Sequence, residues 1–297
     1  MAGLTRKMLN TAYVVPACFL EKKIPYTSPV LVRALQAARL RGIVRQAWKN
    51  VPFYRRAMEE RGLRPADFRS VEDLDKLPLI SKAEMRDDPS IFNSIRVDCQ
   101  QDFLIRAGSY KRIFWSRKAA LQWFARISRS RQVLNNLMDQ DSGYVEFSVN
   151  SEAGCNPNLN RYWREILLFR GRAAARRRVD INESYATVVN EINRLKPDII
   201  YCFGSYSENL IKFVINRDIK LHSPRIWVYG SDMMGAGTRE LIEERLGCMV
   251  YSTYNLNEMG AMSFECERRD GYHINADSCF LRIVDEEGNT LPDGETG

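Results

Sequence analysis

Histidine is scarce in this chain, which has only His222 and His273 among its 297 residues. A metal site built from several histidines is therefore excluded, and a nucleophile paired with histidine would have to use one of these two. Long apolar runs are missing as well. The longest, such as residues 13–20 and 226–229, fall well short of the roughly 20 residues that a membrane span requires.

The sequence also shows no features of a signal peptide or of a disulfide framework. Glu21, Lys22 and Lys23 follow the first apolar stretch, where a signal peptide would have its small-residue cleavage site. The seven cysteines are an odd, scattered set without a CxxC pair, which fits reduced thiols better than disulfides. We therefore expect a cytoplasmic protein without a membrane partner.

Charge and composition leave several partners open. Apolar residues make up 45% and charged residues 27% of the chain, as in ordinary globular proteins. The net charge is +7, and between residues 101 and 180 fifteen Lys or Arg stand against seven Asp or Glu. Such a segment could attract a nucleotide, coenzyme A or nucleic acid, or could be a solvated helical face. Nucleic acid is not favoured, because no aromatic-basic recognition motif accompanies the charge.

Residues 1–95 are predicted to form a helical N-terminal region. Between Pro29 and Glu60, apolar residues recur at helical spacing, with a break at Val51. Ser70 followed by Asp73 is typical of a helix start at which an acidic residue completes the cap.

Residues 96–270 alternate between strand and helix patterns. Strands are predicted at 103–105, 145–149, 166–169, 198–203, 225–229 and 249–254. Helices are predicted at 116–136, 184–195, 209–216 and 238–246. This alternation predicts an α/β fold with parallel strands. Residues 271–297 instead predict a strand, a turn and a second strand, with 280–284 as one of the two.

Three groups of short motifs follow one another along the chain. The first is VPFYR at 51–55 with SVEDL at 70–74 and LPLISK at 77–82. The second is KPD at 196–198, FGSY at 203–206 and WVYGSD at 227–232. The third runs from YNLNEMG at 254–260 through GYHI at 271–274 to GETG at 294–297. In order and spacing, these motifs resemble the phenylacetate–CoA ligase branch of the adenylate-forming (AMP-binding, acyl-CoA synthetase) superfamily.

The resemblance implies both a fold and a reaction. The fold is an adenylation domain with a helical region (1–95), an α/β core of layered sheets (96–270) and the start of a small β-barrel (271–297). Such enzymes use Mg²⁺ and ATP to turn a carboxylate into an acyl-adenylate, and then pass the acyl group to coenzyme A. The resemblance thus implies a ligase for an aryl or other small carboxylic acid, with ATP, Mg²⁺ and coenzyme A. The alternative is a catalytically degenerate relative of the same family, a nucleotide-binding or scaffold protein that uses the same cleft.

The nucleotide site is assigned by matching the motifs residue by residue. Tyr254 and Glu258 match the family's aromatic-x-x-x-Glu element, so Tyr254 would lie against adenine and Glu258 would hold Mg²⁺ in catalysis. A carboxylate suits a hard cation that also binds phosphate oxygens. Asn255 and Asn257 lie within this element and are assigned to the nucleotide with it. The family's adenine-holding turn is matched by Gly230, Ser231 and Asp232.

The acyl pocket is assigned to the end of another strand. Phe203, Gly204 and Tyr206 match the family's pocket wall, and they follow a predicted parallel strand. Ligands of open α/β sheets bind at such strand ends. Trp227 is added as a further apolar lining residue.

The phosphate loop departs from the family pattern. The family has a loop rich in Ser, Thr and Gly, whereas this chain has RAGSYKR at 106–112. Gly108 and Ser109 match the loop and are assigned to the ATP phosphates. Lys111 is assigned a catalytic role, in which its charge, or that of Arg112, replaces missing backbone donors. The alternative is that the loop has lost its function.

The end of the chain departs too. Gly297 falls at the start of the family's β-barrel, and the mobile C-terminal domain with its catalytic lysine is absent. We therefore expect a fragment or a truncated chain. The sequence specifies neither the acyl substrate nor an oligomeric state.

Zinc is a weaker possibility. Cys266 and His273 lie seven residues apart, with Cys248 and Cys279 nearby in sequence, and some members of this branch bind zinc in this region. Zinc accepts these ligand types. Ordinary buried cysteines are favoured, because the spacing matches no compact zinc motif.

Overall fold

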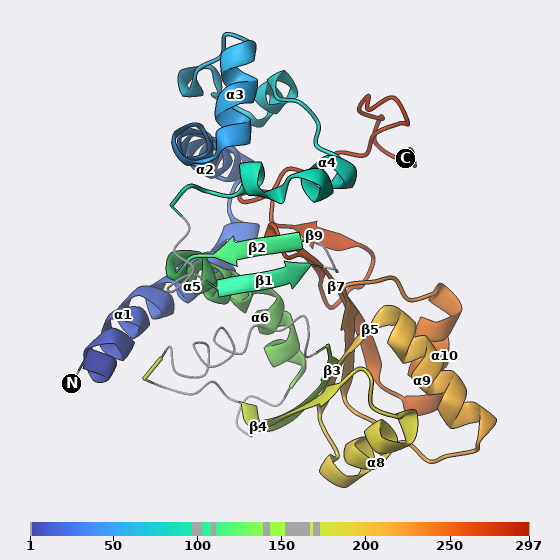
Figure 1. The fold of residues 1–297 in the computed structure, drawn as a ribbon. Coiled ribbons are helices and arrows are strands. Elements are labelled where there is room, and N and C mark those ends of the chain that lie inside the picture. Colours follow the sequence, from blue (N-terminus) through green and yellow to red (C-terminus); the bar gives the residue numbers. More distant parts are fainter. Residues whose placement is uncertain are drawn as a thin grey trace. The chain divides into compact units, whose positions relative to one another are not determined.

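The structure is a computed structural model that describes residues 2–96, 103–107, 111–138, 143–151, 167–168 and 173–296. The chain forms two compact units, each built from two separate stretches of sequence. The first unit comprises Met1–Lys23 and Val97–His273, and the second comprises Ile24–Arg96 and Ile274–Gly297. Figure 1 shows the helices and strands of both units.

The second unit is mainly helical, and its predicted helix signals are confirmed. Val51 separates the first two α-helices, and Ser70 is the N-cap of η3, where its backbone N–H donates to the Asp73 carboxylate at 3.0 Å. Leu40 and Phe68 belong to its buried core. Its helices are η1 Ile24–Tyr26, α2 Pro29–Asn50, α3 Pro52–Glu60, η2 Pro65–Asp67, η3 Val71–Lys76, α4 Lys82–Asp87 and η4 Pro89–Phe92.

The strand predicted at 280–284 is wrong. Within that stretch only Val284 makes a β-bridge, an isolated one to Thr290. Arg282 instead forms an ion pair with Asp75, with 2.5 Å between its Nη1 and the carboxylate, so the segment is held against η3. The turn between the bridge partners is present. The predicted start of a β-barrel stays a prediction.

Three helices and a hairpin open the first unit. Helix α1 (Ala2–Lys23) packs against α5 (Arg117–Arg126) and α6 (Ser128–Leu137). The sequence predicts one helix over 116–136, but it divides at Ile127 into α5 and α6. The predicted cap is confirmed, since the Ser116 hydroxyl accepts from the Ala119 backbone N–H at 3.1 Å. Within the described parts of the chain, no helix is long and apolar enough to cross a membrane.

A seven-stranded sheet forms the centre of the first unit, in the order β4-β3-β5-β6-β7-β8-β9 (Figure 1). Its five strands from β4 to β7 are parallel, and β8 is antiparallel to β7. This arrangement confirms the predicted α/β class. The strands are β3 Tyr144–Asn150, β4 Ala173–Asp180, β5 Ile199–Phe203, β6 Ile226–Gly230, β7 Met249–Leu256, β8 Gly260–Glu265 and β9 Tyr272–Ile274. Among the described residues, the crossover helices are α8 Tyr185–Leu195, α9 Gly204–Asn216 and α10 Ala236–Leu246.

The central strands of this sheet are buried on both faces. On one face Ile200 and Trp227 pack in a large core with residues of α8, α9 and α10. On the other face Ile226 and Val228 pack with residues of α6. Neighbouring residues of one strand therefore enter different cores, because side chains alternate along a strand.

Three strands of the sheet are missing from the sequence prediction. The edge strand β4 contains Arg176, Arg177 and Arg178, whose side chains are all exposed. Three consecutive arginines show no alternation of apolar and polar residues, so the sequence does not indicate a strand there. The short strands β8 and β9 are the other two. The strand predicted at 166–169 is not seen at Leu167 and Leu168, which form a bend, while its other two residues lie outside the described part of the chain.

Candidate functional site

The ends of three neighbouring strands bring most of the predicted segments together. In the parallel register, Phe203 of β5 stands opposite Gly230 of β6, and Gly230 stands opposite Thr253 of β7. The residues that follow are therefore on one edge of the sheet, at the carboxyl ends of its parallel strands. Such edges are where α/β sheets bind ligands. The predicted acyl wall, the adenine turn and Tyr254 thus share one edge.

A carboxylate links the adenine turn to the acyl wall. Gly204 is the first residue of α9, and its backbone N–H donates to the Asp232 carboxylate at 2.5 Å. The Ser205 hydroxyl donates to the same carboxylate, and the Ser205 backbone N–H does so at 3.4 Å. Asp232 therefore caps the positive end of α9 and ties the two predicted segments to each other.

Two glycines allow close backbone approach at this edge. A Cβ atom on Gly204 would lie 2.5 Å from the Met233 carbonyl carbon, and one on Gly230 would lie 2.9 Å from the Thr253 carbonyl oxygen. Neither position has room for a side chain without movement of the backbone. Ser231 has a φ of 70°, in the left-handed region that few residues with side chains adopt. The turn is thus specified by its glycines and by one unusual backbone angle.

The predicted adenine and Mg²⁺ residues lie on the hairpin of β7 and β8. Tyr254 is in β7, with its side chain 49% exposed, and Glu258 is exposed in the turn between the two strands. Asn255 and Asn257 are exposed as well, and the Asn255 amide donates to the Thr253 hydroxyl at 3.2 Å. These side chains are accessible to a ligand.

A tryptophan ties this hairpin to the strand that bears Lys111. The antiparallel hairpin of β1 (Phe103–Ala107) and β2 (Lys111–Trp115) pairs Ala107 with Lys111. At the other end of β2, the Trp115 indole N–H donates to the Asn257 carbonyl at 2.9 Å. Lys111 is thus on an element attached to the turn that carries Glu258. Gly108 and Ser109 lie outside the described residues.

Two of the predicted acyl-pocket residues lie under the surface. Trp227 is fully buried, and its indole N–H donates to the hydroxyl of buried Ser207 at 3.0 Å. Tyr206 is buried beside Tyr185, with 5.1 Å between the ring centroids, and burial raises its pKa above the ordinary range. Both side chains contribute to the core beneath α9. Of the predicted acyl wall, Phe203 remains partly exposed.

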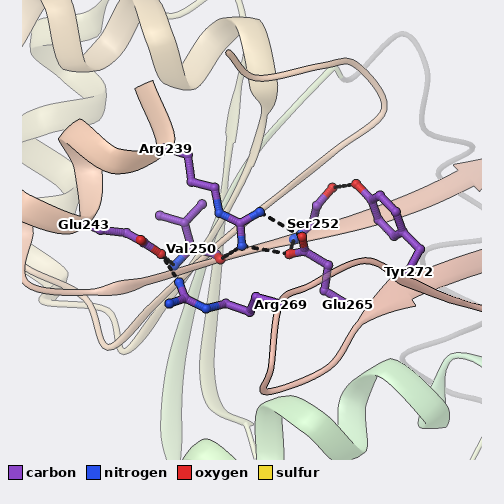
Figure 2. Close-up of polar contacts among 7 residues, drawn as sticks. All are labelled: Arg239, Glu243, Val250, Ser252, Glu265, Arg269 and Tyr272. Atoms are coloured by element: carbon purple, nitrogen blue, oxygen red, sulfur yellow. Dashed lines mark hydrogen bonds and ion pairs between the residues drawn. The ribbon is translucent and has the colours of Figure 1, made fainter. Parts of the chain in front are cut away.

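A polar network that the sequence analysis missed supports β7 (Figure 2). The buried Glu265 carboxylate accepts from the Arg239 guanidinium at 2.8 Å and from the Ser252 backbone N–H at 2.7 Å. Arg239 also donates to the Val250 carbonyl at 2.8 Å, and the Glu243 carboxylate accepts from the Val250 N–H at 3.0 Å. These side chains satisfy backbone groups of β7 ahead of the segment that pairs with β8.

Two further contacts continue this network beyond Glu243 and Ser252. Arg269 pairs with Glu243, and the Tyr272 hydroxyl donates to that of Ser252 (Figure 2). The network fixes the first half of the strand whose second half carries Tyr254. The sequence shows Arg239 and Glu265 as charged residues near predicted or observed secondary structure, but they are 26 residues apart. Only the fold shows that they pair with each other.

Glu258 offers one exposed carboxylate, which is the type of ligand that Mg²⁺ takes. Mg²⁺ that arrives with ATP needs only one or two protein carboxylates, because phosphate and water oxygens complete its shell. A structural zinc needs four protein ligands, and the described residues contain no group of three His, Cys, Asp or Glu that could hold a metal.

The predicted zinc ligands have ordinary surroundings. The His273 ring lies 5.8 Å from the Phe264 ring, centroid to centroid, and Cys266 is a partly buried free thiol. The zinc prediction on Cys266 and His273 therefore finds no support in the structure.

Comparison with known proteins adds relatives of two kinds. No family model matches the chain. It is similar to the phenylacetate–coenzyme A ligase of Escherichia coli K12, with 28% identity over 281 residues that cover 90% of this chain and 61% of that protein. For the phenylacetate–coenzyme A ligase of Thermus thermophilus, the identity is 27% over 285 residues, covering 90% and 60%. The expected resemblance to the phenylacetate–CoA ligases is thus confirmed.

Solved structures give the fold. A crystal structure of 2-hydroxyisobutyryl-CoA ligase in the postadenylation state, in complex with R3-HIB-AMP, superposes with a TM-score of 0.72 at 20% identity, over 92% of this chain and 59% of that one. An open conformation of the same ligase, with 2-HIB-AMP and CoA, has a TM-score of 0.68 over 87% and 62% at 19% identity. The chain therefore has the fold of an adenylate-forming ligase over about three fifths of its relatives' length.

Proposed function

We propose that this chain, a relative of the phenylacetate–CoA ligases, is the adenylating part of an acid–thiol ligase. In the proposed reaction, a carboxylate oxygen of the substrate attacks the α-phosphorus of ATP, and pyrophosphate leaves. The complete enzyme then lets the thiol of coenzyme A attack the acyl carbonyl, and AMP leaves. The relatives' names support this chemistry, and the substrate class we propose is an aryl or other small carboxylic acid.

The observation that carries the proposal is the shared strand edge. Gly204 and Ser231 follow the parallel strands β5 and β6, Tyr254 follows the last residue of β7 that pairs with β6, and Asp232 joins the first two of these segments. A nucleotide that stacks on exposed Tyr254 would lie beside the turn at Ser231, and an acyl group would lie beside Phe203 and Gly204. The two groups that must react would therefore be held on one edge, which is the main requirement for a displacement at phosphorus.

The phosphate charges of ATP are assigned to two hairpins, that of β1 and β2 and that of β7 and β8. We propose that Glu258 holds the Mg²⁺ that arrives with ATP and that Gly108, Ser109 and Lys111 receive the phosphates. Bound Mg²⁺ would neutralise charge that develops on the phosphate oxygens. The bond between Trp115 and the Asn257 carbonyl supports this pairing, because it fixes β2 to the turn that bears Glu258. The cytoplasmic location expected from the sequence stays a prediction.

Nucleotide binding tests the proposal directly. We expect millimolar Mg-ATP or AMP to raise the melting temperature, because a ligand that binds only the folded state stabilises it. Tyr254→Ala should weaken AMP binding by about tenfold, since stacking of a base on an aromatic ring contributes about 1–3 kcal/mol. Glu258→Gln should leave AMP binding intact and weaken Mg-ATP binding, because an amide is a poorer Mg²⁺ ligand than a carboxylate.

Glu244→Gln is the matched control, because Glu244 is an exposed acid in the last turn of α10. The control should bind Mg-ATP as the unchanged chain does. Pyrophosphate exchange with candidate acids measures adenylation itself, and Glu258→Gln should abolish it. Binding without exchange would favour a non-catalytic nucleotide-binding relative, and the absence of any binding would contradict the nucleotide site.

A further inference from the structure

The outer face of α1 is apolar and uncovered. Nine of its exposed side chains are apolar or aromatic, including Leu9 at 67% exposure and both Phe19 and Leu20 at 64%. Monomeric proteins rarely leave so continuous an apolar surface open unless it binds something. The nine, which we call the α1 face, are Leu4, Met8, Leu9, Ala12, Tyr13, Val15, Pro16, Phe19 and Leu20.

The opposite side of α1 is firmly attached to its unit. Val14 is 1% exposed, and the Ser128 hydroxyl donates to the Cys18 carbonyl at 3.3 Å. Glu21, the one acid of the helix, pairs with Arg129, whose side chain is 1% exposed. Figure 1 shows α1 lying beside α5 in this unit. The helix is therefore held by its inner side, and its acid is turned away from the α1 face.

The charges that α1 itself carries at the two ends of the α1 face are positive. Arg6 and Lys7 lie near the start of the helix, and Lys22 and Lys23 end it. This belongs to a wider bias, because the first 58 residues contain eleven Lys or Arg and a single acid, Glu21. A helix with an apolar face and basic flanks is typical of segments that lie in the surface of a membrane.

The same charges argue against a second copy of the chain as the occupant. If two α1 helices paired antiparallel through their apolar faces, Arg6 and Lys7 of one would lie beside Lys22 and Lys23 of the other. A parallel pair would place like residues side by side. Either arrangement brings positive charges together and is repulsive. An anionic bilayer offers instead an apolar interior beneath a negative surface, and each lysine or arginine near that surface contributes attraction.

We propose that α1 docks on the surface of an anionic lipid bilayer, with the α1 face in the boundary between headgroups and acyl chains. The helix lies in the membrane surface and does not cross it, in line with its moderate hydropathy. The sequence-based expectation of no membrane partner rested on missing membrane spans, which do not bear on a helix of this kind. The proposal is independent of the ligase function.

Co-sedimentation of the full chain with vesicles tests the proposal. We expect binding to phosphatidylcholine vesicles that contain about one third phosphatidylglycerol, and weaker binding to phosphatidylcholine alone or at high salt. Phe19→Ser and Leu20→Ser should each lower the vesicle affinity about tenfold, because each removes a large apolar side chain. Lys22→Gln with Lys23→Gln should lower the affinity about fivefold per charge, on anionic vesicles only.

Ile215→Ser is the matched control, because it removes an exposed apolar side chain from α9 of the same unit. It should bind vesicles as the unchanged chain does, and circular dichroism and urea unfolding should show all variants folded. The proposal is overturned if the unchanged chain ignores anionic vesicles, or if the α1 variants bind as well as Ile215→Ser. It is also overturned if light scattering shows a dimer that Phe19→Ser dissociates, which would make a second copy the occupant.

Discussion

At the scale of single residues, the close backbone approach at Gly204 is a stringent test of the site. A Cβ there would lie 2.5 Å from the Met233 carbonyl carbon, so Gly204→Ala must displace the segment after Asp232. Overpacking of this kind costs about 1–3 kcal/mol. We expect urea unfolding to show a loss of that size, and we expect AMP binding to weaken, because Asp232 would lose its alignment with α9.

Gly237→Ala is the control for that substitution. A Cβ on Gly237 meets nothing within 4 Å, and this residue lies in α10, where alanine is favoured over glycine by up to about 1 kcal/mol. This variant should be as stable as the unchanged chain or more stable, with unaltered AMP binding. If Gly204→Ala behaves like Gly237→Ala, the close approach between Gly204 and Met233 is not real.

At the scale of elements, the network of Figure 2 predicts coupling between α10, β7 and β8. Arg239→Leu leaves the Glu265 carboxylate buried without its guanidinium, and unpaired buried charges cost about 3–5 kcal/mol. Glu265→Leu should lower the free energy of unfolding by a similar amount. The double variant should lose at least about 1 kcal/mol less than the sum of the two single losses, which is a typical coupling energy between contacting residues. Urea unfolding of the four proteins measures this difference.

Arg245→Gln serves as the control for the network, because Arg245 is an exposed residue of the same helix. A surface change of this kind usually alters stability by no more than about 0.5 kcal/mol. Strictly additive losses for Arg239→Leu and Glu265→Leu would show that the two side chains act separately.

The elements also show how far the sequence could be read. The end of β5 at Phe203 was predictable, and that of β6 to within one residue, because glycine interrupts the short apolar runs there, whereas β7 continues to Leu256, two residues past its predicted end. The positions of Tyr206 and Trp227 were not predictable. In a parallel strand buried on both faces the apolar run is continuous, so the sequence does not show which side Trp227 faces. The edge strand β4 was missed for the opposite reason, since its exposed arginines give no apolar pattern.

At the scale of the whole molecule, burial of thiols predicts how stability changes with pH. Burial raises the pKa of both Cys202 and Cys248 to about 12, from an ordinary value of 9.0. Between these values the unfolded chain loses the thiol protons while the folded chain keeps them. The unfolded state then binds fewer protons, so stability falls as pH rises. Below about pH 8.5 both states are almost fully protonated, and these groups have almost no effect.

We therefore expect these two thiols to leave the free energy of unfolding, measured in urea, unchanged up to about pH 8.5. By pH 10 it should fall by about 1.4 kcal/mol for each of the two thiols, one pH unit above their unfolded pKa. The buried Tyr201 hydroxyl, whose pKa burial also raises, adds to the fall above that pH. Cys202→Ala with Cys248→Ala should reduce the slope between pH 8.5 and 10, whatever stability the lost packing removes, and the Cys18 thiol, whose pKa burial also raises, contributes to the slope that remains. Exposed Glu244→Gln should keep the original slope, and an unchanged slope after removal of both thiols would show that other groups cause the alkaline loss.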